Sequence, residues 1–294
     1  MAQPEGAPPA SASVEGAAEV DLEALADAYN RGLACEKAGD RAGAVAAFRA
    51  ALALDPEDRG GCGLRLAALG ALTPEEAPVT APPAYVATLF DQTAERFDEI
   101  LVEQLGYAVP MLLRERLDAI GAGPFGRLLD LGCGTGLAGE SLADLAEEVT
   151  GVDLSEEMLG EADARGAYDA LYAGDAAAFL AVSGEEGEPP FDLIVATDML
   201  PYLGALEALF EGLAARLARG GLVALSAETM AQAEIGPSGY CVGAHHRFAH
   251  SERYLRARLA AVGLLVRDWQ PITVRYESGT PVPGVLLIAA GPGG

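Results

Sequence analysis

The chain lacks long apolar runs, and its first residues lack positive charge. Gly, Arg or Asp interrupts every apolar stretch before it reaches the ~18 residues that a membrane-spanning helix needs. Residues 1–20 contain Glu5, Glu15 and Glu19 but neither Lys nor Arg, which is unlike a secretory or mitochondrial leader. We therefore expect a cytoplasmic protein with no membrane segment, and a content of 51% hydrophobic residues is ample for a globular core.

Cysteine and basic residues are also scarce. The cysteines at 35, 62, 133 and 241 form no Cys-x-x-Cys pair, so they fit neither a zinc site nor a disulfide framework, and we expect reduced thiols. The 44 acidic residues outnumber the 19 basic ones, which gives a formal net charge of −25. Such a surface repels a phosphate backbone at long range, which argues against a nucleic-acid partner.

The first 83 residues divide into three segments by composition. Residues 1–20 are mostly Ala, Pro, Gly, Ser and Glu, with little to bury, and are expected to form a disordered tail. Over residues 21–72 apolar side chains recur at three- and four-residue steps, as at Leu22, Leu25 and Tyr29, which predicts two antiparallel helices. Four prolines make residues 73–83 an extended linker.

The helical segment resembles a tetratricopeptide repeat in the spacing of its small residues. The positions that carry the resemblance are Gly32, Gly39, Ala44, Phe48, Ala51 and Pro56. Ala28 and Cys35 replace the bulky residues that are usual in the first helix, and a single repeat cannot stack into a solenoid. We interpret the segment as a cap on the main domain or on a second copy of the protein; the alternative is a docking site for a partner peptide.

Residues 84–294 alternate between helical and strand-like patterns. Strands are expected near 128–131, 149–152, 171–173, 193–197, 222–226, 264–266 and 285–289. Helix-length amphipathic segments separate the first five, which predicts an α/β fold with a doubly wound, mostly parallel sheet. The sequence between the last two strands is too irregular for a crossover helix, so we expect these strands to pair antiparallel at one edge. A helix is expected from about 86 to 104, and Pro110 should open another.

A glycine-rich turn after the first of these strands predicts a site for an adenosine-containing cofactor. Residues 134–139 match the dinucleotide pattern G-x-G-x-x-G, so a nicotinamide or flavin enzyme is one interpretation. However, the carboxylate of Asp130 would oppose a pyrophosphate at this turn, whereas it would favour the ammonium and sulfonium of S-adenosylmethionine. Asp153 ends the second strand, where it could accept both ribose hydroxyls of either cofactor.

Five motifs in order give the chain a resemblance to the class I S-adenosylmethionine-dependent methyltransferases over about residues 90–290. They lie at 128–136 (LLDLGCGTG), 151–159 (GVDLSEEML), 174–176 (GDA), 191–194 (FDLI) and 219–222 (RGGL). The resemblance implies a seven-stranded Rossmann-like sheet whose last strand is antiparallel. The helical segment ahead of it is similar to a bacterial subgroup of these enzymes with an N-terminal tetratricopeptide segment.

The resemblance also implies a cofactor site. Asp130, Gly132, Gly134 and Gly136 would line the methionine end, and Asp153 would take the ribose. Leu154 and Met158 would flank the adenine, with Asp175 and Ala176 at its edge. Asp198 would lie near the methionine amino group. Ser155 we interpret as a helix N-cap whatever is bound.

The acceptor side is marked by a histidine cluster between the fifth strand and the following helix. His246 or His250 could act as a general base, with Arg247 or Arg275 holding an anionic acceptor; the alternative is that these residues only brace the loop. No carboxylate or cysteine at matching spacing supports a metal site, so none is expected. Phe90 and Phe97 could close a lid over the cofactor, but core packing is the interpretation that we prefer.

The sequence therefore favours an S-adenosylmethionine-dependent methyltransferase that acts on a small molecule, with a protein acceptor as the alternative. The competing classes are an NAD(P)-dependent oxidoreductase and a non-catalytic interaction protein that uses the helical segment. The segment could also serve a homodimer.

Overall fold

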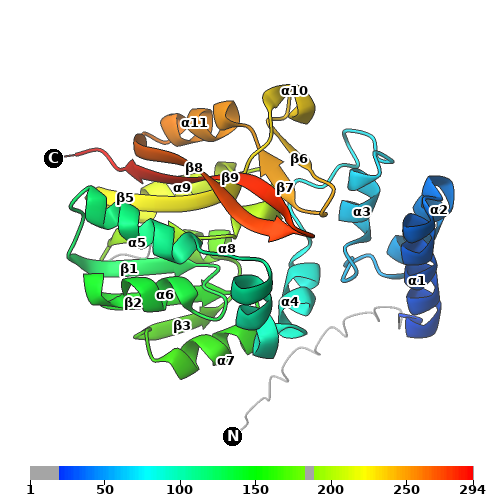
Figure 1. Ribbon diagram of the computed structural model, residues 1–294, viewed down its shortest axis with the longest axis horizontal. Helices are drawn as coiled ribbons and strands as arrows, with labels where there is room; N and C mark the ends of the chain where they lie inside the picture. Colours follow the sequence, from blue (N-terminus) through cyan, green and yellow to red (C-terminus); the bar gives the residue numbers. More distant parts are fainter. Residues whose placement is uncertain (1–19, 183–188, 294) are drawn as a thin grey trace, which may run out of the picture.

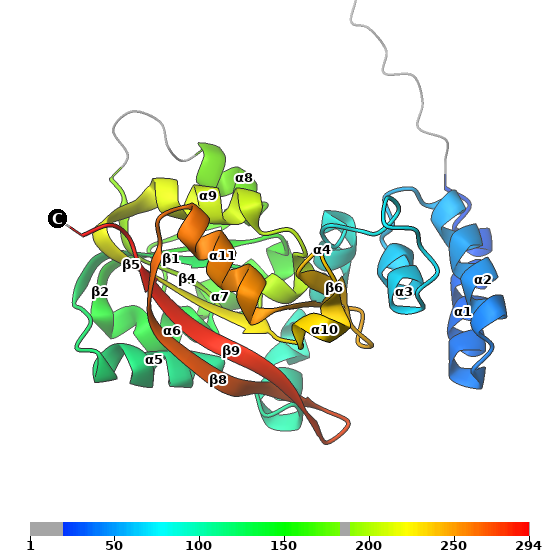
Figure 2. The ribbon, with the colours of Figure 1, turned by 90° about the horizontal axis from the view of Figure 1, so that it is seen from above.

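The computed structural model describes residues 20–182 and 189–293 (Figure 1). Almost all of the tail expected at residues 1–20 lies outside the described residues. A seven-stranded sheet forms the centre, helices cover both of its faces, and the N-terminal helices stand to one side (Figures 1 and 2).

The strand order of the sheet is β3-β2-β1-β4-β5-β9-β8. The strands are β1 (Phe125–Leu131), β2 (Ala146–Asp153), β3 (Ala170–Ala173), β4 (Phe191–Ala196), β5 (Leu217–Glu228), β8 (Leu265–Glu277) and β9 (Thr280–Ala290). The first five pair in parallel, while β9 is antiparallel to both β5 and β8. This confirms the expected doubly wound sheet with an antiparallel end.

Each face of the sheet buries its own apolar layer. Leu113, Leu128 and Leu142 belong to the layer under α5 (Val109–Ala119) and α6 (Leu137–Leu142). Ile194 and Phe210 belong to the opposite layer, under α8 (Ala176–Val182), α9 (Glu207–Arg216) and α11 (Glu252–Ala261). Strand β2 is preceded by the 3₁₀ turn η3 (Ala143–Leu145) and followed by helix α7 (Glu156–Arg165). Because the central strands are covered on both faces, their carboxyl ends are the open edge.

The last two strands are much longer than the sequence indicated. The residues that looked irregular extend β8 and β9 into a hairpin that projects beyond the sheet (Figure 2). Ser278 and Gly279 form its turn, with φ of 50° and 78°. Two successive positive φ values are typical of a type I′ turn, which matches the twist of paired strands. Pro271 is tolerated in β8 because this strand lies at the sheet edge.

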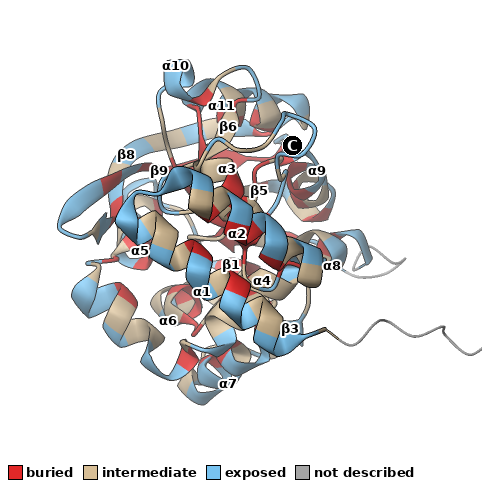
Figure 3. Ribbon diagram, turned by 90° about the vertical axis from the view of Figure 1, so that its right-hand side faces the viewer, coloured by how far each residue is buried: buried red, intermediate tan, exposed pale blue. Residues whose placement is uncertain are grey.

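The N-terminal segment forms α1 (Leu22–Ala38), α2 (Arg41–Leu54) and α3 (Cys62–Ala68). A Cβ on Gly32 would lie 2.4 Å from the ring of Phe48, so the close approach of α1 and α2 requires glycine there. Buried, intermediate and exposed residues all occur along α1–α3 (Figure 3), and Leu64 of α3 belongs to one apolar cluster with Tyr85 and Phe248. The segment therefore packs on the main domain; its kinship to tetratricopeptide repeats and the domain boundaries stay predictions.

The segment from 73 to 104 is not laid out as expected. The linker is held in place, because Ala81 donates its N–H to Tyr202 O at 2.8 Å and Gly204 donates to Val79 O at 3.0 Å. The helix predicted from 86 to 104 is wrong: the chain forms α4 (Pro83–Asp91), a 3₁₀ turn η1 (Ala94–Arg96) and a π-helical turn η2 (Glu99–Gln104).

The remaining elements follow β4 and β5. They are the 3₁₀ turn η4 (Leu200–Tyr202), α10 (Gln232–Ile235) and a small hairpin of β6 (Tyr240–Val242) and β7 (Phe248–His250). Within the described residues, no helix is both long and apolar enough to cross a membrane.

Candidate cofactor and acceptor site

A cavity with about 1060 Å³ of empty space lies beyond the carboxyl ends of β1, β2, β3 and β4. Its floor is formed by the glycine turn at 132–135, and its sides by residues 152–154, 174–177 and 197–199. Phe90 and Phe97 line it from above. In parallel sheets ligands bind at this edge, next to the point where the strand order reverses, and β1 and β4 are the strands at that point.

The glycine turn has a backbone that other residues would not adopt easily. Gly132 has φ of 67°, and a Cβ there would lie 3.0 Å from Met199. Gly134 has φ of 53°, and its N–H donates to Asp153 Oδ2 at 2.8 Å. The turn is therefore held open towards the cavity by its own conformation and by one carboxylate.

Asp153 is the most constrained carboxylate of the cavity. Its Oδ1 accepts from Ser155 N at 2.9 Å in addition to the bond from Gly134 to Oδ2. Burial raises the pKa of Asp153, and the two backbone donors oppose that rise. Because each carboxylate oxygen has two acceptor sites, both oxygens keep capacity for a ligand hydroxyl. Leu154, next to it, also lines the cavity.

Asp175 and Asp198 complete the acidic lining. Asp175 Oδ1 caps α8 by accepting from Ala178 N at 2.8 Å, and Ala176 lies beside it in the cavity wall. Asp198 has a left-handed backbone, with φ of 58°, and donates its N–H to Ser226 Oγ at 2.8 Å. None of the described residues that line this cavity is Lys, Arg or His.

Three residues that the sequence placed at the cofactor do not line the cavity: Asp130, Gly136 and Met158. Asp130 is fully buried, and Tyr168 donates its hydroxyl to Asp130 Oδ2 at 2.7 Å. Burial raises the pKa of Asp130 to about 7. The preference for a cationic ligand over a pyrophosphate, first attributed to Asp130, therefore depends on Asp153, Asp175 and Asp198, which do line the cavity.

Two hydrogen bonds connect the segment above the cavity to the cofactor loops. Ser155 Oγ donates to Asp91 Oδ1 at 2.6 Å while it accepts from Met158 N, which confirms Ser155 as a helix N-cap. Thr135 Oγ1 donates to Asp98 Oδ1, also at 2.6 Å. Asp98 forms an ion pair with Arg165 as well.

The aromatic side chains above the cavity serve as both core and roof. Phe90 contacts Phe97 edge to face, with ring centres 5.7 Å apart, and contacts Tyr202 in the same way at 5.3 Å. Core packing, the role that we preferred for Phe90 and Phe97, is therefore only part of their role, because both residues also line the cavity.

Neither histidine assigned as a base reaches the cavity. His250 is fully buried in β7, and its Nε2 lies 3.1 Å from Gly204 O. Burial lowers the pKa of His250 to about 4. His246 points the other way, with Nε2 3.7 Å from Glu36 Oε1 of α1, and burial lowers its pKa too. This geometry favours the bracing interpretation of both residues, and their assignment to catalysis stays a prediction.

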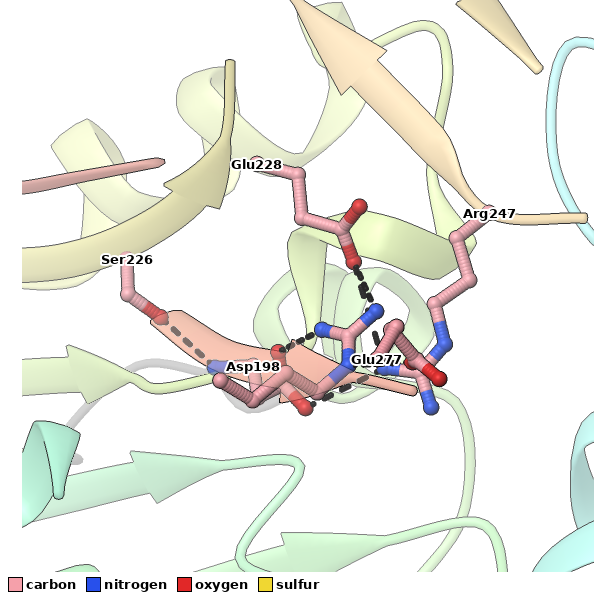
Figure 4. A network of polar contacts seen from close by, with 6 residues as sticks. Asp198, Ser226, Glu228, Arg247 and Glu277 are labelled. Atoms are coloured by element: carbon pink, nitrogen blue, oxygen red, sulfur yellow. Dashed lines mark hydrogen bonds and ion pairs between the residues drawn. The ribbon is translucent and has the colours of Figure 1, made fainter. Parts of the chain in front are cut away.

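Arg247 and Arg275 belong to a buried ionic network next to the cavity (Figure 4). Arg275, fully buried in β8, donates to Glu228 Oε1 at 2.7 Å and to Glu277 Oε1 at 2.8 Å. Arg247 Nη1 lies 3.4 Å from Asp198 Oδ2. Asp198 Oδ1 has no hydrogen-bond partner among the described residues, although Arg275 Nη1 is 3.6 Å away. Asp198 therefore faces the arginines as well as the cavity.

Sequence reasoning missed the residues that close the cavity from distant segments. They include Thr80, Ala81, Pro83, Val86, Leu101, Tyr107 and Tyr202. The apolar residues after Asp198 were a partial signal, because a loop that follows the carboxyl end of a parallel strand often lines the ligand site. Within the described residues, no group of three or more His, Cys, Asp or Glu side chains is placed to hold a metal ion.

Comparisons with known proteins agree with this geometry. Residues 129–223 match a family described as a methyltransferase domain. A demethylmenaquinone methyltransferase from Beutenbergia cavernae is 40% identical over 95 residues, which cover 32% of this chain and 39% of that protein. A ubiquinone biosynthesis O-methyltransferase from Caulobacter is 33% identical over 132 residues, or 42% and 52% of the two chains. The chain thus spans about two fifths to one half of these curated relatives.

Solved structures share the fold over a larger part of the chain. The N-methyltransferase NodS from Bradyrhizobium japonicum, in complex with S-adenosyl-L-homocysteine, matches with a TM-score of 0.54 at 16% identity, covering 70% of this chain and 98% of NodS. An S-adenosylmethionine-dependent methyltransferase from Clostridium acetobutylicum matches with a TM-score of 0.51 at 18% identity, over 70% and 100%. The chain therefore shares the fold of these S-adenosylmethionine-dependent methyltransferases, residues 129–223 match a methyltransferase domain, and three N-terminal helices stand beside this fold.

Proposed function

We propose that this protein transfers a methyl group from S-adenosylmethionine to a small-molecule acceptor. One observation carries the proposal: the cavity at the carboxyl edge is lined by three carboxylates and, among its described residues, by no Lys or Arg. Such a lining favours a cationic ligand and opposes a pyrophosphate. S-adenosylmethionine has a sulfonium and an ammonium group, whereas a nicotinamide dinucleotide brings two negative charges to the same turn.

The residues present fit this cofactor. Asp153 keeps acceptor capacity for two ribose hydroxyls, and Asp198 Oδ1 is a buried acceptor without a hydrogen-bond partner in the described chain. Asp175 and Ala176 would meet the edge of the adenine, next to Leu154. Gly132 and Gly134 would let the backbone approach the methionine end, and a cation there would satisfy Asp198.

The protein's own contribution to the reaction is alignment and exclusion of water. The bound cofactor supplies an electrophilic methyl group, so that bringing a nucleophile into line with the methyl carbon and sulfur provides much of the rate enhancement. The aromatic roof of Phe90, Phe97 and Tyr202 covers the cavity, and the bonds from Thr135 and Ser155 hold this roof in place.

A small acceptor is favoured over a macromolecule for two reasons. The curated relatives are named as methyltransferases of demethylmenaquinone and of ubiquinone biosynthesis. The net charge of −25 opposes nucleic acid. We also propose a cytoplasmic location, and a homodimer or a partner protein bound through α1–α3 stays a prediction.

The deciding experiment is calorimetric titration of the protein with S-adenosylhomocysteine and, separately, with NADH. We expect saturable binding of S-adenosylhomocysteine and none of NADH. Binding of NADH alone would favour the oxidoreductase, and binding of neither would favour a non-catalytic interaction protein. Transfer of a labelled methyl group from S-adenosylmethionine to an acceptor library then tests catalysis.

A further inference from the structure

A second cavity lies beside the first, where β5 ends. It is an open hollow of about 1600 Å³, its mouth included, lined by residues of 228–234, of the loop at 243–247, of the start of α11 and of β8 and β9. Its walls are largely apolar, with Met230, Trp269, Pro271, Val282 and Val285 among them. A hollow of this kind fits a mainly apolar small molecule.

Arg247 stands between the two cavities. It lines the second cavity, while its Nη1 is 3.4 Å from Asp198 Oδ2 and its guanidinium carbon is 5.4 Å from the ring centre of Tyr202. Asp198 and Tyr202 both line the first cavity. In Figure 4 the side chain of Arg247 comes from the loop side and its guanidinium reaches the network at Asp198 and Glu228. A ligand oxygen bound to Arg247 is therefore held at the border of the cofactor site.

Arg247 is held less tightly by carboxylates than Arg275 is. Arg275 makes contacts of 2.7 and 2.8 Å to Glu228 and Glu277, which engage these carboxylates. Arg247 has five N–H donors, but its contacts to Asp198 and Glu228 are 3.4 and 3.9 Å. A ligand oxygen could accept from the remaining donors without displacing a strong ion pair.

The other charged groups around the second cavity are largely compensated. Glu228 is paired with Arg275, and Glu252 with Arg256 at 2.7 Å. Glu234 and Arg253 lie at exposed positions, as does His245. Next to the first cavity the lining thus offers a ligand the half-buried cation of Arg247, beside largely apolar walls.

We propose that the second cavity binds the methyl acceptor, a mainly apolar small molecule with an anionic oxygen (a carboxylate or an ionised hydroxyl), and that Arg247 holds this oxygen beside the cofactor. The inference rests on the proposed function. The oxygen's lone pair forms the new O–CH₃ bond while the C–S bond breaks; its electron pair stays on sulfur, and the sulfonium becomes a neutral thioether. Because the oxygen is bound as its anion, no base is needed, in keeping with the absence of His246 and His250 from the described lining of both cavities.

Trp269 is the chain's single tryptophan and lines the second cavity, so its fluorescence reports binding there. The probes are octanoate, octanol and octylamine, which do not absorb where tryptophan does, added to protein saturated with S-adenosylhomocysteine. We expect octanoate to change the fluorescence saturably and to bind at least about ten-fold more tightly than the other two, as a charge-assisted hydrogen bond would give.

Arg247→Gln should weaken octanoate binding by about ten-fold or more, because this half-buried cation is lost, and leave octanol unchanged. The matched control is Arg253→Gln, which removes an exposed cation from the mouth of the same cavity and should change the dissociation constant by less than about two-fold. Thermal unfolding of each variant shows whether it is folded. In the labelled-methyl assay, carboxylic acids or phenols should be methylated in preference to amines, with a raised KM for Arg247→Gln.

Equal binding of octanoate and octylamine, an equal effect of both substitutions, or calorimetric binding without a fluorescence change would overturn the proposal. Failure of the proposed function is recognised separately, because it would appear as a lack of S-adenosylhomocysteine binding before any probe is added.

Discussion

The two halves of the sheet's carboxyl edge are built in different ways. At β1, β2 and β3 the site depends on the backbone: a glycine turn with positive φ is held by Asp153, whose carboxylate accepts from two N–H groups. At β4, β5 and β8 it depends on side chains that are far apart in the sequence, with Arg275 joining Glu228 and Asp198. In the proposed function the first half would hold the cofactor, and the second half would hold the acceptor.

The largest loss of stability is expected from a substitution in the ionic network at β4, β5 and β8. Arg275→Met removes the close partner of the buried Glu228 and leaves only Arg247, 3.9 Å away, which should cost about 3–5 kcal/mol of unfolding free energy. The double variant with Glu228→Met should be less destabilised than the single one. Arg116→Met is the control, because its pair with Asp268 is partly exposed and worth at most about 1 kcal/mol. Urea unfolding measures all three, and equal losses for Arg275 and Arg116 would show that the network does not stabilise this half.

The next largest effect is the pH dependence of stability that His250 of β7 should cause. Its pKa is about 4 in the folded protein against an ordinary 6.5, so the unfolded chain takes up the proton first. The stabilising effect of the neutral imidazole is complete above pH 6.5 and is lost as the pH falls towards 4, by about 3 kcal/mol in all.

His250→Gln keeps a donor for Gly204 O but does not titrate. Urea unfolding at both ends of this window should therefore show a smaller loss for the variant than for the unchanged protein. Turnover of His250→Gln at neutral pH should stay within about two-fold, since the side chain does not reach the cavity. A loss of turnover with unchanged stability would restore the histidine as a base.

The sequence was most informative where the structure depends on neighbouring residues. The first five strands of the sheet, the glycine turn, Asp153 and the N-cap at Ser155 all follow from local patterns, and the structure has them where expected. Asp130 was misplaced although it lies in the same motif. It sits within β1, so its side chain points to a face of the sheet and meets Tyr168, which is 38 residues away.

The surroundings of His246 and His250 could not be predicted for the same physical reason. The spacing of His246 and His250 could not show that residues 240–250 form a hairpin, nor that His250 would be buried against Gly204, 46 residues earlier. The partners of Arg247 and Arg275 are equally distant along the chain. Periodicity predicts which face of an element is buried, but it does not indicate which buried polar groups meet.

The cofactor half can be tested through Asp153. Asp153→Asn keeps one acceptor oxygen, so it should still hold one of the two backbone N–H groups while losing part of the ribose contact. We expect affinity for S-adenosylhomocysteine to fall by about ten-fold, measured by calorimetry. Asp175→Asn is the matched control at a half-exposed position and should have a smaller effect. If both substitutions are equally harmful, simple charge and not the geometry of Asp153 determines binding.

The smallest effect is expected where the two halves meet, at Ser226. This buried hydroxyl accepts from Asp198 N at 2.8 Å and so supports the left-handed backbone that carries Asp198 between the cavities. Ser226→Ala leaves that N–H without a partner and should cost about 1 kcal/mol of unfolding free energy. Ser141→Ala, which removes only a 3.3 Å bond to Pro110 O at a half-buried position, should cost less than about 0.5 kcal/mol. Because Asp198 faces both sites, Ser226→Ala should weaken S-adenosylhomocysteine and octanoate binding together. If the substitution weakens the binding of only one of these ligands, Asp198 contributes to that ligand's cavity alone and does not connect the two halves.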